Sequence, residues 1–370
     1  MATKQMGRGI ALACQGGGSH TAFTAGVLSE LLANDDRDIR ALSGTSGGAV
    51  CAFLVWSGLL LGGQQGRSVG VARLEQFWRN LQPQGLVETL QDAIVIDTLR
   101  AIGRLGFVPE FSPYRNAFEA SRDFRKLIEE SVPFDEISIP ATGPRLLISA
   151  AEVRSGEFRI FRSHMIDEEP ADEITSNVIL ASAAVPTLFR AVHLGSNIYW
   201  DGLFAQNPPV RDLPDAARGE GDDGRPPNEL WVIMINPLRQ HSEPKRMDDI
   251  RDRRNELAAN ISFQQEIHFI GKINELAKRD LLASKAKKKY HPIKVRAIAM
   301  SEEVGASLDY ESKLSRNPSH ITSLMEHGKQ QARSFLADLD GPNADDRTAI
   351  LSRDIWGRRK DRSWTPLPDI

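Results

Sequence analysis

Short apolar runs that end in turns of small or polar residues recur along the chain, and they predict buried strands. The predicted strands are Ile10–Cys14, a second that ends near Leu42, Arg145–Glu152, Glu157–Phe161, Asn197–Gly202, Glu229–Asn236 and Val295–Met300. Apolar residues at helical spacing predict helices between these strands. The predicted helices are Ala22–Ala33, Leu74–Leu90, Phe124–Ser131 and Asp248–Arg279, with a core helix in the apolar stretch Ala49–Gly63.

Glycine, proline and polar residues mark the predicted connections. Gly58–Gly70 is rich in glycine and is interpreted as a connection. Ile94–Tyr114 mixes apolar residues with glycine and proline, which is typical of a loose surface element suited to cover a cleft. The small residues of Ala181–Pro186 let a helix pack closely on a sheet, and Pro186 is expected to end that helix.

Composition narrows the class of protein. With 370 residues, 41% of them hydrophobic and 26% charged, the chain can bury one large core or two modest ones. A net charge of −3 gives no electrostatic basis for binding nucleic acid. Cys14 and Cys51 lie in apolar segments, so we interpret them as small buried residues rather than a disulfide or a metal-binding pair. A reducing compartment fits this use of cysteine.

The sequence also bears on membranes. No export signal is visible, and Ala49–Gly63 is shorter than the roughly 18 apolar residues that a membrane-spanning helix needs. We therefore expect a cytoplasmic protein that contacts a membrane, if at all, at its surface. Lys285, Lys287, Lys288 and Lys289 form a run of positive charge, which usually marks a solvated face; attraction to an anionic membrane is the alternative.

The stretch Gly44-Thr45-Ser46-Gly47-Gly48 joins an apolar strand to an apolar helix. A serine on such a strained turn needs small residues two positions before and after it, here Gly44 and Gly48, and its hydroxyl then points out of the sheet beside a helix N-terminus. This arrangement predicts a catalytic nucleophile at Ser46. The alternative is a glycine-rich turn without chemical function, because Gly-x-Ser-x-Gly often occurs by chance.

A second glycine-rich loop, Gly16-Gly17-Gly18, follows the first predicted strand. Its backbone N–H groups can approach an anion closely, either a nucleotide phosphate or the oxyanion of a tetrahedral intermediate. The nucleotide interpretation is weak because Thr21 stands where a dinucleotide fingerprint has glycine or alanine, and because no acidic residue for a ribose ends the second strand. The oxyanion interpretation places the loop beside Ser46 in a parallel sheet.

A nucleophilic serine needs a base. None of the eight histidines follows a strand as a triad histidine does, and His320 and His327 are expected at the surface of a polar helix. Asp201 ends a predicted strand before Gly202, at the edge where open parallel sheets place their chemistry. An ordinary aspartate, with a pKa of about 3.9, is a weak base toward a hydroxyl, so burial and oxyanion stabilisation must supply the remainder. The alternative for Asp201 is a turn-forming residue.

Four motifs occur in a set order: Gly16-Gly17-Gly18, the Ser46 turn, Ala181–Pro186 and Asp201-Gly202. Together they resemble the patatin-like phospholipase family over residues 8 to 240. The resemblance implies a three-layer α/β/α sandwich with a central, mainly parallel sheet. It also implies a Ser46–Asp201 dyad, an oxyanion loop at Gly16, Gly17 and Gly18, and hydrolysis of fatty acyl esters in lipids. Residues 1–340 would form one acyl hydrolase domain, with a helical part at 241–340 and a charged peripheral tail at 341–370.

The chain departs from the family pattern near the glycine loop. Gln15 stands where the family often has an acidic residue or glycine, His20 where it has arginine, and Thr21 where it has glycine. Leu203 also stands where the family usually has alanine or glycine. Because a neutral imidazole attracts anions less than a guanidinium does, these changes leave open how a phosphate headgroup is held.

The expected reaction is acyl transfer from a lipid or other ester to Ser46, followed by hydrolysis with Asp201 as the base. No cofactor is implied, and no metal, because the sequence has no cluster of ligands at metal-binding spacing. Alternatives are a soluble carboxylesterase, a lipid acyltransferase, or a non-catalytic lipid or nucleotide binder. A peptidase is disfavoured because a Ser-Asp pair offers no good acid for an amine leaving group. Headgroup preference, acyl-chain preference and oligomeric state are not predicted.

Overall fold

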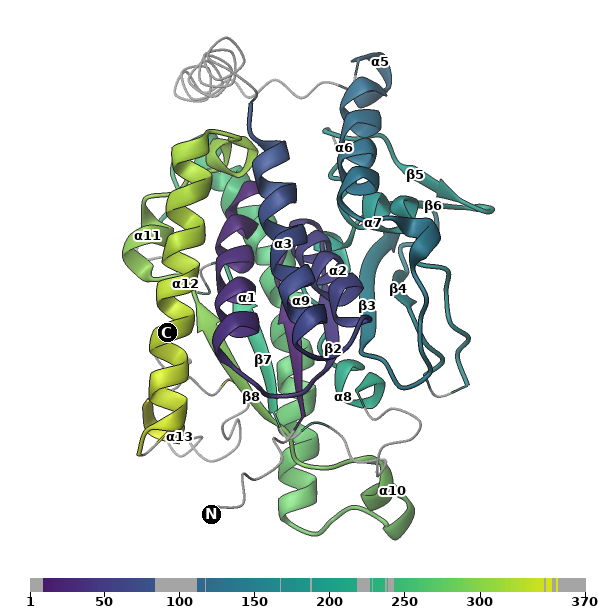
Figure 1. Ribbon diagram of the computed structural model, residues 1–370, viewed down its shortest axis with the longest axis vertical. Helices are drawn as coiled ribbons and strands as arrows, with labels where there is room; N and C mark the ends of the chain where they lie inside the picture. The colour runs from purple at the N-terminus through teal and green to yellow at the C-terminus, as the bar shows by residue number, and fades with distance from the viewer. Residues whose placement is uncertain are drawn as a thin grey trace.

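The computed structural model describes residues 9–83, 112–116, 118–166, 168–186, 188–217, 227, 229–236, 238, 243–342, 344–347 and 351. In this part of the chain a sheet runs through the middle of the molecule, with helices on both sides (Figure 1). The strands are β1 (Ile10–Cys14), β2 (Ile39–Gly44), β3 (Arg145–Glu152), β4 (Phe158–Arg162), β5 (Val192–Leu194), β6 (Asn197–Asp201), β7 (Glu229–Met234) and β8 (Lys294–Ala299).

The helices differ widely in length. The α-helices are α1 (Ala22–Asn34), α2 (Gly47–Leu59), α3 (Gly63–Leu81), α5 (Pro113–Asn116), α6 (Phe118–Ser131), α7 (Ser176–Ser182), α8 (Leu213–Ala216), α9 (Met247–Lys278), α10 (Ser284–Lys289), α11 (Glu302–Ala306), α12 (Pro318–Asp340) and α13 (Ala344–Arg347). Short 3₁₀ helices are η1 (Gly18–Thr21), η2 (Phe134–Glu136), η3 (Gly202–Phe204) and η4 (Glu311–Leu314).

The strand order is β5-β6-β3-β2-β1-β7-β8, with β4 pairing with β3. The neighbouring strands β3, β2, β1, β7 and β8 are mutually parallel. The strands β4, β5 and β6 are antiparallel to their neighbours. The predicted mainly parallel sheet is therefore confirmed, and so is the predicted hairpin of β3 and β4.

Alternating side chains on the strands serve two separate cores. On β1, Leu12 and Cys14 pack into the core beneath α1, α2 and α12, whereas Ala11 and Ala13 pack into the core beneath α9. The buried face of α9 includes Phe263, as its apolar spacing predicts. Helices on both faces make the predicted three-layer α/β/α sandwich. Both cysteines, Cys14 and Cys51, are buried and unbonded, which confirms their interpretation as small core residues.

One edge of β3 holds two strands end to end. Its first half pairs with β2, so that Gly44 lies opposite Ile148. Its last residues pair with β6, so that Asp201 lies opposite Ala150. Because β4 occupies the other edge of β3, β2 and β6 share one edge and their C-terminal ends meet. Asp201 ends its strand at this edge as expected, although β6 runs antiparallel to β3 and reaches the edge because β3 extends beyond β2.

The predicted connection Gly58–Gly70 is wrong, because α3 begins at Gly63 and ends at Leu81. A side-chain carbon on Gly58 would lie 2.4 Å from the backbone nitrogen of Gly70 and 2.8 Å from the carbonyl oxygen of Gly66. These glycines therefore let α2 and α3 pack backbone to backbone, a use of glycine that the sequence does not distinguish from a loop.

The helix expected to end at Pro186 ends earlier, because α7 stops at Ser182 and an irregular turn follows. The expected lid at Ile94–Tyr114 lies almost wholly outside the described residues, and so does the tail beyond residue 351. The division into a 1–340 domain and a tail stays a prediction.

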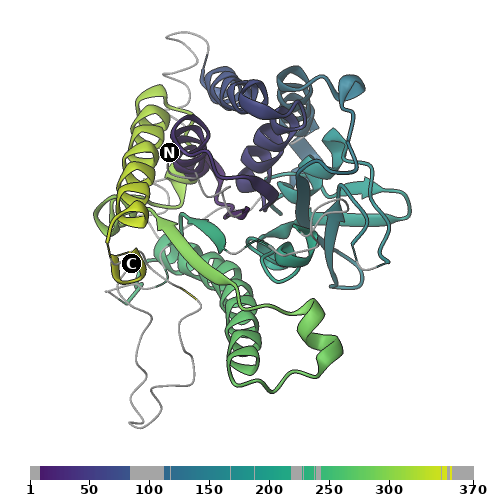
Figure 2. The same cartoon turned by 60° about the horizontal axis from the view of Figure 1, so that its bottom comes forward.

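The long helix α12 lies beside α1 in both ribbon views (Figures 1 and 2). Gly26 and Gly328 let the two helices approach closely, because neither has a side chain. A side-chain carbon on Gly26 would lie 1.9 Å from Met325 O, and one on Gly328 would lie 2.1 Å from Phe23 O. The predicted surface residues His320 and His327 are half-buried at this side of α12, and His327 Nε2 accepts a hydrogen bond from Ser301 N at 3.2 Å. That expectation is corrected.

The lysine run lies on α10, which protrudes beyond the end of α9 (Figure 2). It precedes β8 and therefore belongs to the edge of the sheet where the parallel strands begin, opposite the edge where β1 and β2 end. Lys285 and Lys287 are exposed, and Lys287 Nζ lies 2.5 Å from Asp280 Oδ1. Membrane attraction at this run stays a prediction, but it would act far from the glycine loops.

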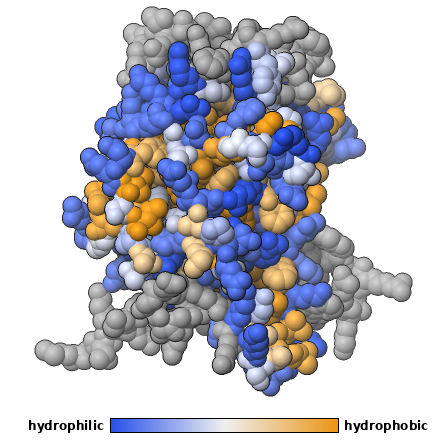
Figure 3. Space-filling view, turned by 90° about the vertical axis from the view of Figure 1, so that its right-hand side faces the viewer, coloured by the Kyte–Doolittle hydropathy of each residue, from blue (hydrophilic) through white to orange (hydrophobic). Residues whose placement is uncertain are grey.

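The face that contains β4, β5 and β6 is mostly hydrophilic, with hydrophobic residues in separate groups (Figure 3). Large apolar side chains are exposed at several places, including Phe158, Met165 and Phe204. Within the described ranges, no helix is both long enough and apolar enough to span a bilayer.

Candidate active site

Ser46 occupies the sharp turn between β2 and α2 that its sequence predicts. Its backbone has φ 55° and ψ −130°, a strained conformation for a residue with a side chain. The flanking glycines are required by space: a side-chain carbon would lie 2.5 Å from Gly48 O if placed on Gly44, and 2.3 Å from Cys14 O if placed on Gly48. Ser46 N donates to Ser182 Oγ at 3.0 Å, which holds the turn in place.

Hydrogen bonds tie this turn to the loop that follows Asp201. Thr45 Oγ1 and Ser149 Oγ lie 2.7 Å apart, and both contact Gln206 O, at 2.6 and 2.7 Å. Ser43, on β2, also contacts this loop, because its Oγ donates a hydrogen bond to Pro209 O at 2.6 Å. The loop 202–209 is thereby fixed against β2 and β3.

Asp201 is fully buried at the end of β6. Its Oδ1 accepts a hydrogen bond from Leu203 N at 2.8 Å, whereas its buried Oδ2 makes none with the described part of the chain. Burial raises the pKa of Asp201 to about 7, and the Leu203 N–H and the Ser46 side chain oppose part of this rise. Ser46 is thus close enough to act on the carboxyl, although no hydrogen bond of ordinary geometry joins them in this structure.

The glycine loop lies directly against Ser46. A side-chain carbon on Gly16 would lie 2.7 Å from Ser46 Cβ, so only glycine fits there. Gly16 N donates to Asn207 Oδ1 at 2.6 Å and is therefore occupied. The N–H groups of Gly17 and Gly18 donate to no atom of the described chain, and both residues line the cavity that contains Ser46.

Two amide side chains hold the glycine loop from below. Asn207 also donates from Nδ2 to Gly16 O at 3.3 Å, so it contacts both backbone groups of Gly16. Gln15 Oε1 accepts hydrogen bonds from Ile235 N at 2.9 Å and Asn236 N at 3.1 Å, which joins the loop to the end of β7. The departure from the family pattern at Gln15 therefore serves a structural contact.

The buried acid Glu266 of α9 anchors the far end of the Asp201 loop. Its Oε2 accepts hydrogen bonds from Val210 N at 2.7 Å and Arg211 N at 3.1 Å, and its Oε1 accepts one from Gln206 Nε2. Burial raises the pKa of Glu266, while these donors lower it. A helix distant in sequence thus fixes the segment that contains Asn207.

A cavity of about 250 Å³ opens beside Ser46 and Asp201. Most of its apolar lining residues come from α2, α3, α6 and the turn after α7, and most of its polar ones from α9, the residues around η4 and the end of β7; we call these two groups the apolar end and the polar end. The apolar end is lined by Val50, Phe77, Trp78, Leu81, Phe124, Leu188 and Phe189; the polar end is lined by Asn236, Asp252, Asn255, Glu256, Tyr310, Lys313 and Arg316. No histidine of the described chain lines this cavity, whereas Asp201 does. His241 lies outside the described residues.

His20 is buried behind the glycine loop instead of facing the cavity. Its Nε2 lies 2.7 Å from Ser312 Oγ, and its ring lies 6.1 Å from that of His320. Burial, with the charges of Lys313 and His320, holds the pKa of His20 well below its usual range. Within the described ranges no three histidine, cysteine or acidic side chains gather as metal ligands would.

The sequence pattern of the family described as patatin-like phospholipase matches residues 12–214, more than half of the chain. The chain belongs to the patatin-like phospholipase family. Its family places it among lipid acyl hydrolases, and the matched segment contains the glycine loop, the Ser46 turn and Asp201. None of the curated proteins compared with it matches.

Two solved structures resemble this chain at low sequence identity. VipD from Legionella pneumophila is 9% identical, with a TM-score of 0.40, over 93% of this chain and 68% of that one. The ExoU chain of the ExoU–SpcU complex from the type III secretion system of Pseudomonas aeruginosa is 16% identical, with a TM-score of 0.30, over 89% of this chain and 52% of that one. This chain therefore spans about half the length of ExoU.

The contacts of several site residues were not predicted from the sequence. Asn207, Ser182 and Glu266 each make their contact across more than 50 positions of sequence. Ser182 belongs to the Ala181–Pro186 motif, which was interpreted only as a place of close helix packing, and no local pattern marks Asn207 or Glu266. The contact of Asn207 with Gly16 joins the loop after β6 to the loop after β1, two segments 191 positions apart in sequence. Lys313 lies outside the segment matched by the patatin-like pattern.

Proposed function

We propose that this patatin-like protein hydrolyses fatty acyl esters of phospholipids or related lipids, with Ser46 as nucleophile and Asp201 as its base. The observation that carries the proposal is the position of Asp201: fully buried, with one carboxylate oxygen unpaired and its pKa raised to about 7, in the cavity that Ser46 lines. A raised pKa makes the carboxylate a stronger base than an ordinary aspartate near neutral pH.

In the first step Ser46 Oγ attacks the ester carbonyl while Asp201 Oδ2 accepts the hydroxyl proton. The carbonyl oxygen becomes negatively charged and is held by the N–H groups of Gly17 and Gly18, with the N-terminus of α2 beside it. Gly16 shapes the loop without donating, because its N–H is bonded to Asn207. The tetrahedral intermediate then expels the alcohol, which takes the proton from Asp201, and an acyl-Ser46 ester remains.

In the second step Asp201 accepts a proton from water as the water attacks the acyl ester. The tetrahedral intermediate then releases the fatty acid, and Asp201 gives the proton to Ser46 Oγ, which restores both groups. The apolar end of the cavity, with Phe77, Trp78 and Phe124, is suited to the acyl chain. Because α9 and η4 supply the polar end, we also propose that residues 241–340 belong to the same catalytic domain as the motif-bearing part.

The test is release of fatty acid from phospholipid vesicles and of p-nitrophenol from short esters. We expect Ser46→Ala and Asp201→Asn to lose at least about 1,000-fold in kcat/KM, since both remove a group that acts in the transition state. Ser196→Ala and Asp135→Asn are the matched controls, because both side chains are exposed and outside the cavity. Mass spectrometry of the protein after a fluorophosphonate probe should find the label on Ser46.

The outcomes separate the candidate functions. Cleavage of short esters without phospholipids indicates a carboxylesterase, and transfer of the acyl group to an added alcohol indicates an acyltransferase. Full activity of Asp201→Asn would show that another group is the base. No cleavage and no label at Ser46 would indicate a non-catalytic binder and overturn the proposal.

A further inference from the structure

The polar end of the cavity has no cationic side chain at the position where the patatin-like pattern has arginine. His20 stands there, buried and bonded to Ser312, with its pKa held below its usual range. It is therefore neutral at neutral pH and turned away from the cavity. Any phosphate of a lipid headgroup needs a different partner.

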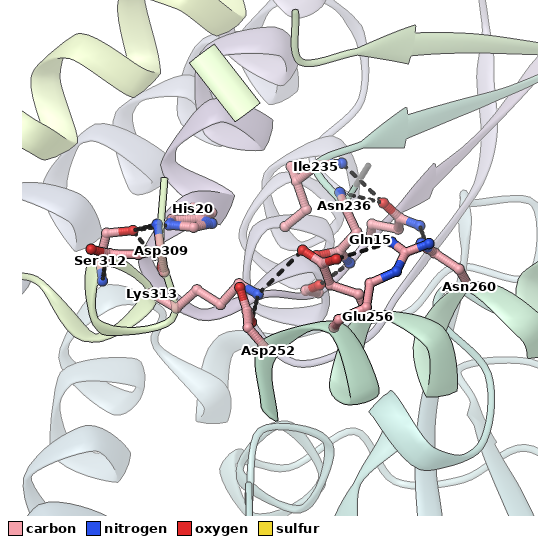
Figure 4. Close-up of polar contacts among 12 residues, drawn as sticks. Gln15, His20, Ile235, Asn236, Asp252, Glu256, Asn260, Asp309, Ser312 and Lys313 are labelled. Carbon is pink, nitrogen blue, oxygen red and sulfur yellow. Dashed lines mark hydrogen bonds and ion pairs between the residues drawn. The ribbon is translucent and has the colours of Figure 1, made fainter. Parts of the chain in front are cut away.

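Lys313 is placed to be that partner. Its carbonyl oxygen packs on the glycine loop, since a side-chain carbon on Gly18 would lie 2.3 Å from it. Its side chain reaches from η4 across to α9, where Nζ contacts Asp252 Oδ1 and lies 3.9 Å from Glu256 Oε1 (Figure 4). All three side chains line the cavity and are only 12–17% exposed.

The charges at this end nearly cancel. Arg253 lies 3.1 Å from the other oxygen of Glu256, and the other cation of the lining, Arg316, is exposed, which leaves Lys313 and Asp252 as the partly buried pair of opposite charges. A ligand with one charge of a single sign would pair with one of them and leave the other uncompensated in a partly buried place, which is costly. A ligand with adjacent charges of both signs exchanges one ion pair for two.

We infer that the polar end is a subsite for a zwitterionic phosphodiester headgroup, with Lys313 contacting the phosphate and Asp252 the ammonium group. This rests on the proposed function for its substrate and deepens it by naming a headgroup class. Phosphatidylcholine and phosphatidylethanolamine fit. Phosphatidylglycerol brings a negative charge with no positive one, so that it would take Lys313 as its partner and leave Asp252 without one.

The test measures binding to the Ser46→Ala protein, which does not depend on turnover. Dihexanoyl phosphatidylcholine and dihexanoyl phosphatidylglycerol, used as monomers below their micelle concentration, carry the same chains and present no membrane surface. We expect the choline lipid to bind about tenfold more tightly by calorimetry, the size of difference that one well-placed charge pair provides.

Variants in the Ser46→Ala background assign the two contacts. Asp252→Asn should reduce the preference to about twofold or less, and Lys313→Gln should weaken binding of both lipids about fivefold or more. Asp249→Asn, on the same helix but outside the cavity lining, is the matched control and should keep the full preference. Circular dichroism checks that each variant is folded.

Glycerophosphocholine, the headgroup without acyl chains, distinguishes a lipid site from a site for free phosphodiesters. It should compete weakly with the choline lipid; competition equal to that of the lipid would assign the site to the free compound and overturn the lipid subsite. Equal or tighter binding of phosphatidylglycerol, or an unchanged preference in Asp252→Asn, would also overturn it. If the unmodified protein releases no fatty acid in a Ser46-dependent way, the proposed function fails, and the binding preference still decides the subsite.

Discussion

Asn207 holds Gly16 through both of its backbone groups: Gly16 N donates to Oδ1 at 2.6 Å, and Nδ2 donates to Gly16 O at 3.3 Å. This contact joins the loop after the proposed base to the loop that would bind the oxyanion. Asn207 is fully buried, so its amide has no water to replace these partners. The position of Gly17 and Gly18 relative to Ser46 therefore depends on a residue that need not touch the substrate.

Replacing Asn207 with alanine should lower kcat/KM for ester hydrolysis by about 10- to 100-fold, because the oxyanion donors lose their alignment. It should also lower the melting temperature, since Gly16 N–H becomes a buried donor without a partner. Steady-state kinetics and thermal unfolding measure the two effects. Asn197→Ala, at an exposed position of β6, is the control. Unchanged kinetics in a folded Asn207→Ala protein would contradict this role.

The rate should depend on pH through Asp201. A base must be ionised to accept a proton, and the pKa of Asp201 is raised to about 7 by burial. We expect kcat/KM to rise with pH, to reach half of its maximum near pH 7, and to level off at higher pH. A pH–rate profile with a monomeric ester, which avoids vesicle effects, measures this. A profile already flat from pH 5 would show that the group acts in another ionisation state.

The same pKa predicts how stability changes with pH. The folded state holds a proton on Asp201 up to about pH 7, whereas the unfolded state loses it near the ordinary value of 3.8. Between these values the folded state binds more protons, so this group lowers the free energy of unfolding by up to about 1.4 kcal/mol for each pH unit of increase.

Asp201→Asn removes that dependence while keeping the shape of the side chain. We expect the variant to be more stable than the unmodified protein at pH 8 and to have a smaller advantage or none at pH 5. Urea unfolding at the two pH values measures the difference. An advantage that is equal at both values would show that Asp201 is not the source.

Gly16 is predicted to tolerate no side chain. In Gly16→Ala the new carbon would lie 2.4 Å from Thr45 O and 2.7 Å from Ser46 Cβ, so either the loop or the turn must move. We expect a loss of at least about 100-fold in kcat/KM, because displacement of the reacting groups by about 1 Å has an effect of this size. Gly305→Ala, where a side-chain carbon meets nothing within 4 Å, should be as active as the unmodified protein.

Much of the fold follows from local sequence. The apolar runs of β1 and β7 and the helical spacing of α9 predicted these elements correctly, because each element buries the residues that its pattern indicates. Ser46 was found because the strained turn constrains its neighbours in sequence. Gly58, Gly66 and Gly70 were misread because close helix packing and a loop both favour glycine, and only the partner helix tells them apart.

The rest of the candidate site depends on contacts between distant segments. β6 pairs antiparallel with the part of β3 that extends beyond β2, and no local pattern in the sequence of β6 indicates that direction. Lys313 and Asp252 are ordinary charged residues until η4 and α9 are packed together. The proposed role of Asp201 was predicted chiefly from its place in an ordered set of motifs, whereas Ser46 was also indicated by its own turn.

The shared edge of β3 also sets the spacing between β2 and β6. Gly44, two residues before Ser46, pairs with Ile148, and Asp201 pairs with Ala150, two positions further along the same strand. The register on β3 therefore sets the distance between the Ser46 turn and Asp201. A slip of β6 by a single residue would turn Asp201 toward the opposite face of the sheet, where α9 packs. The β5–β6 hairpin turn can therefore vary in length without altering the chemistry, whereas one inserted residue between Ile148 and Ala150 should abolish it.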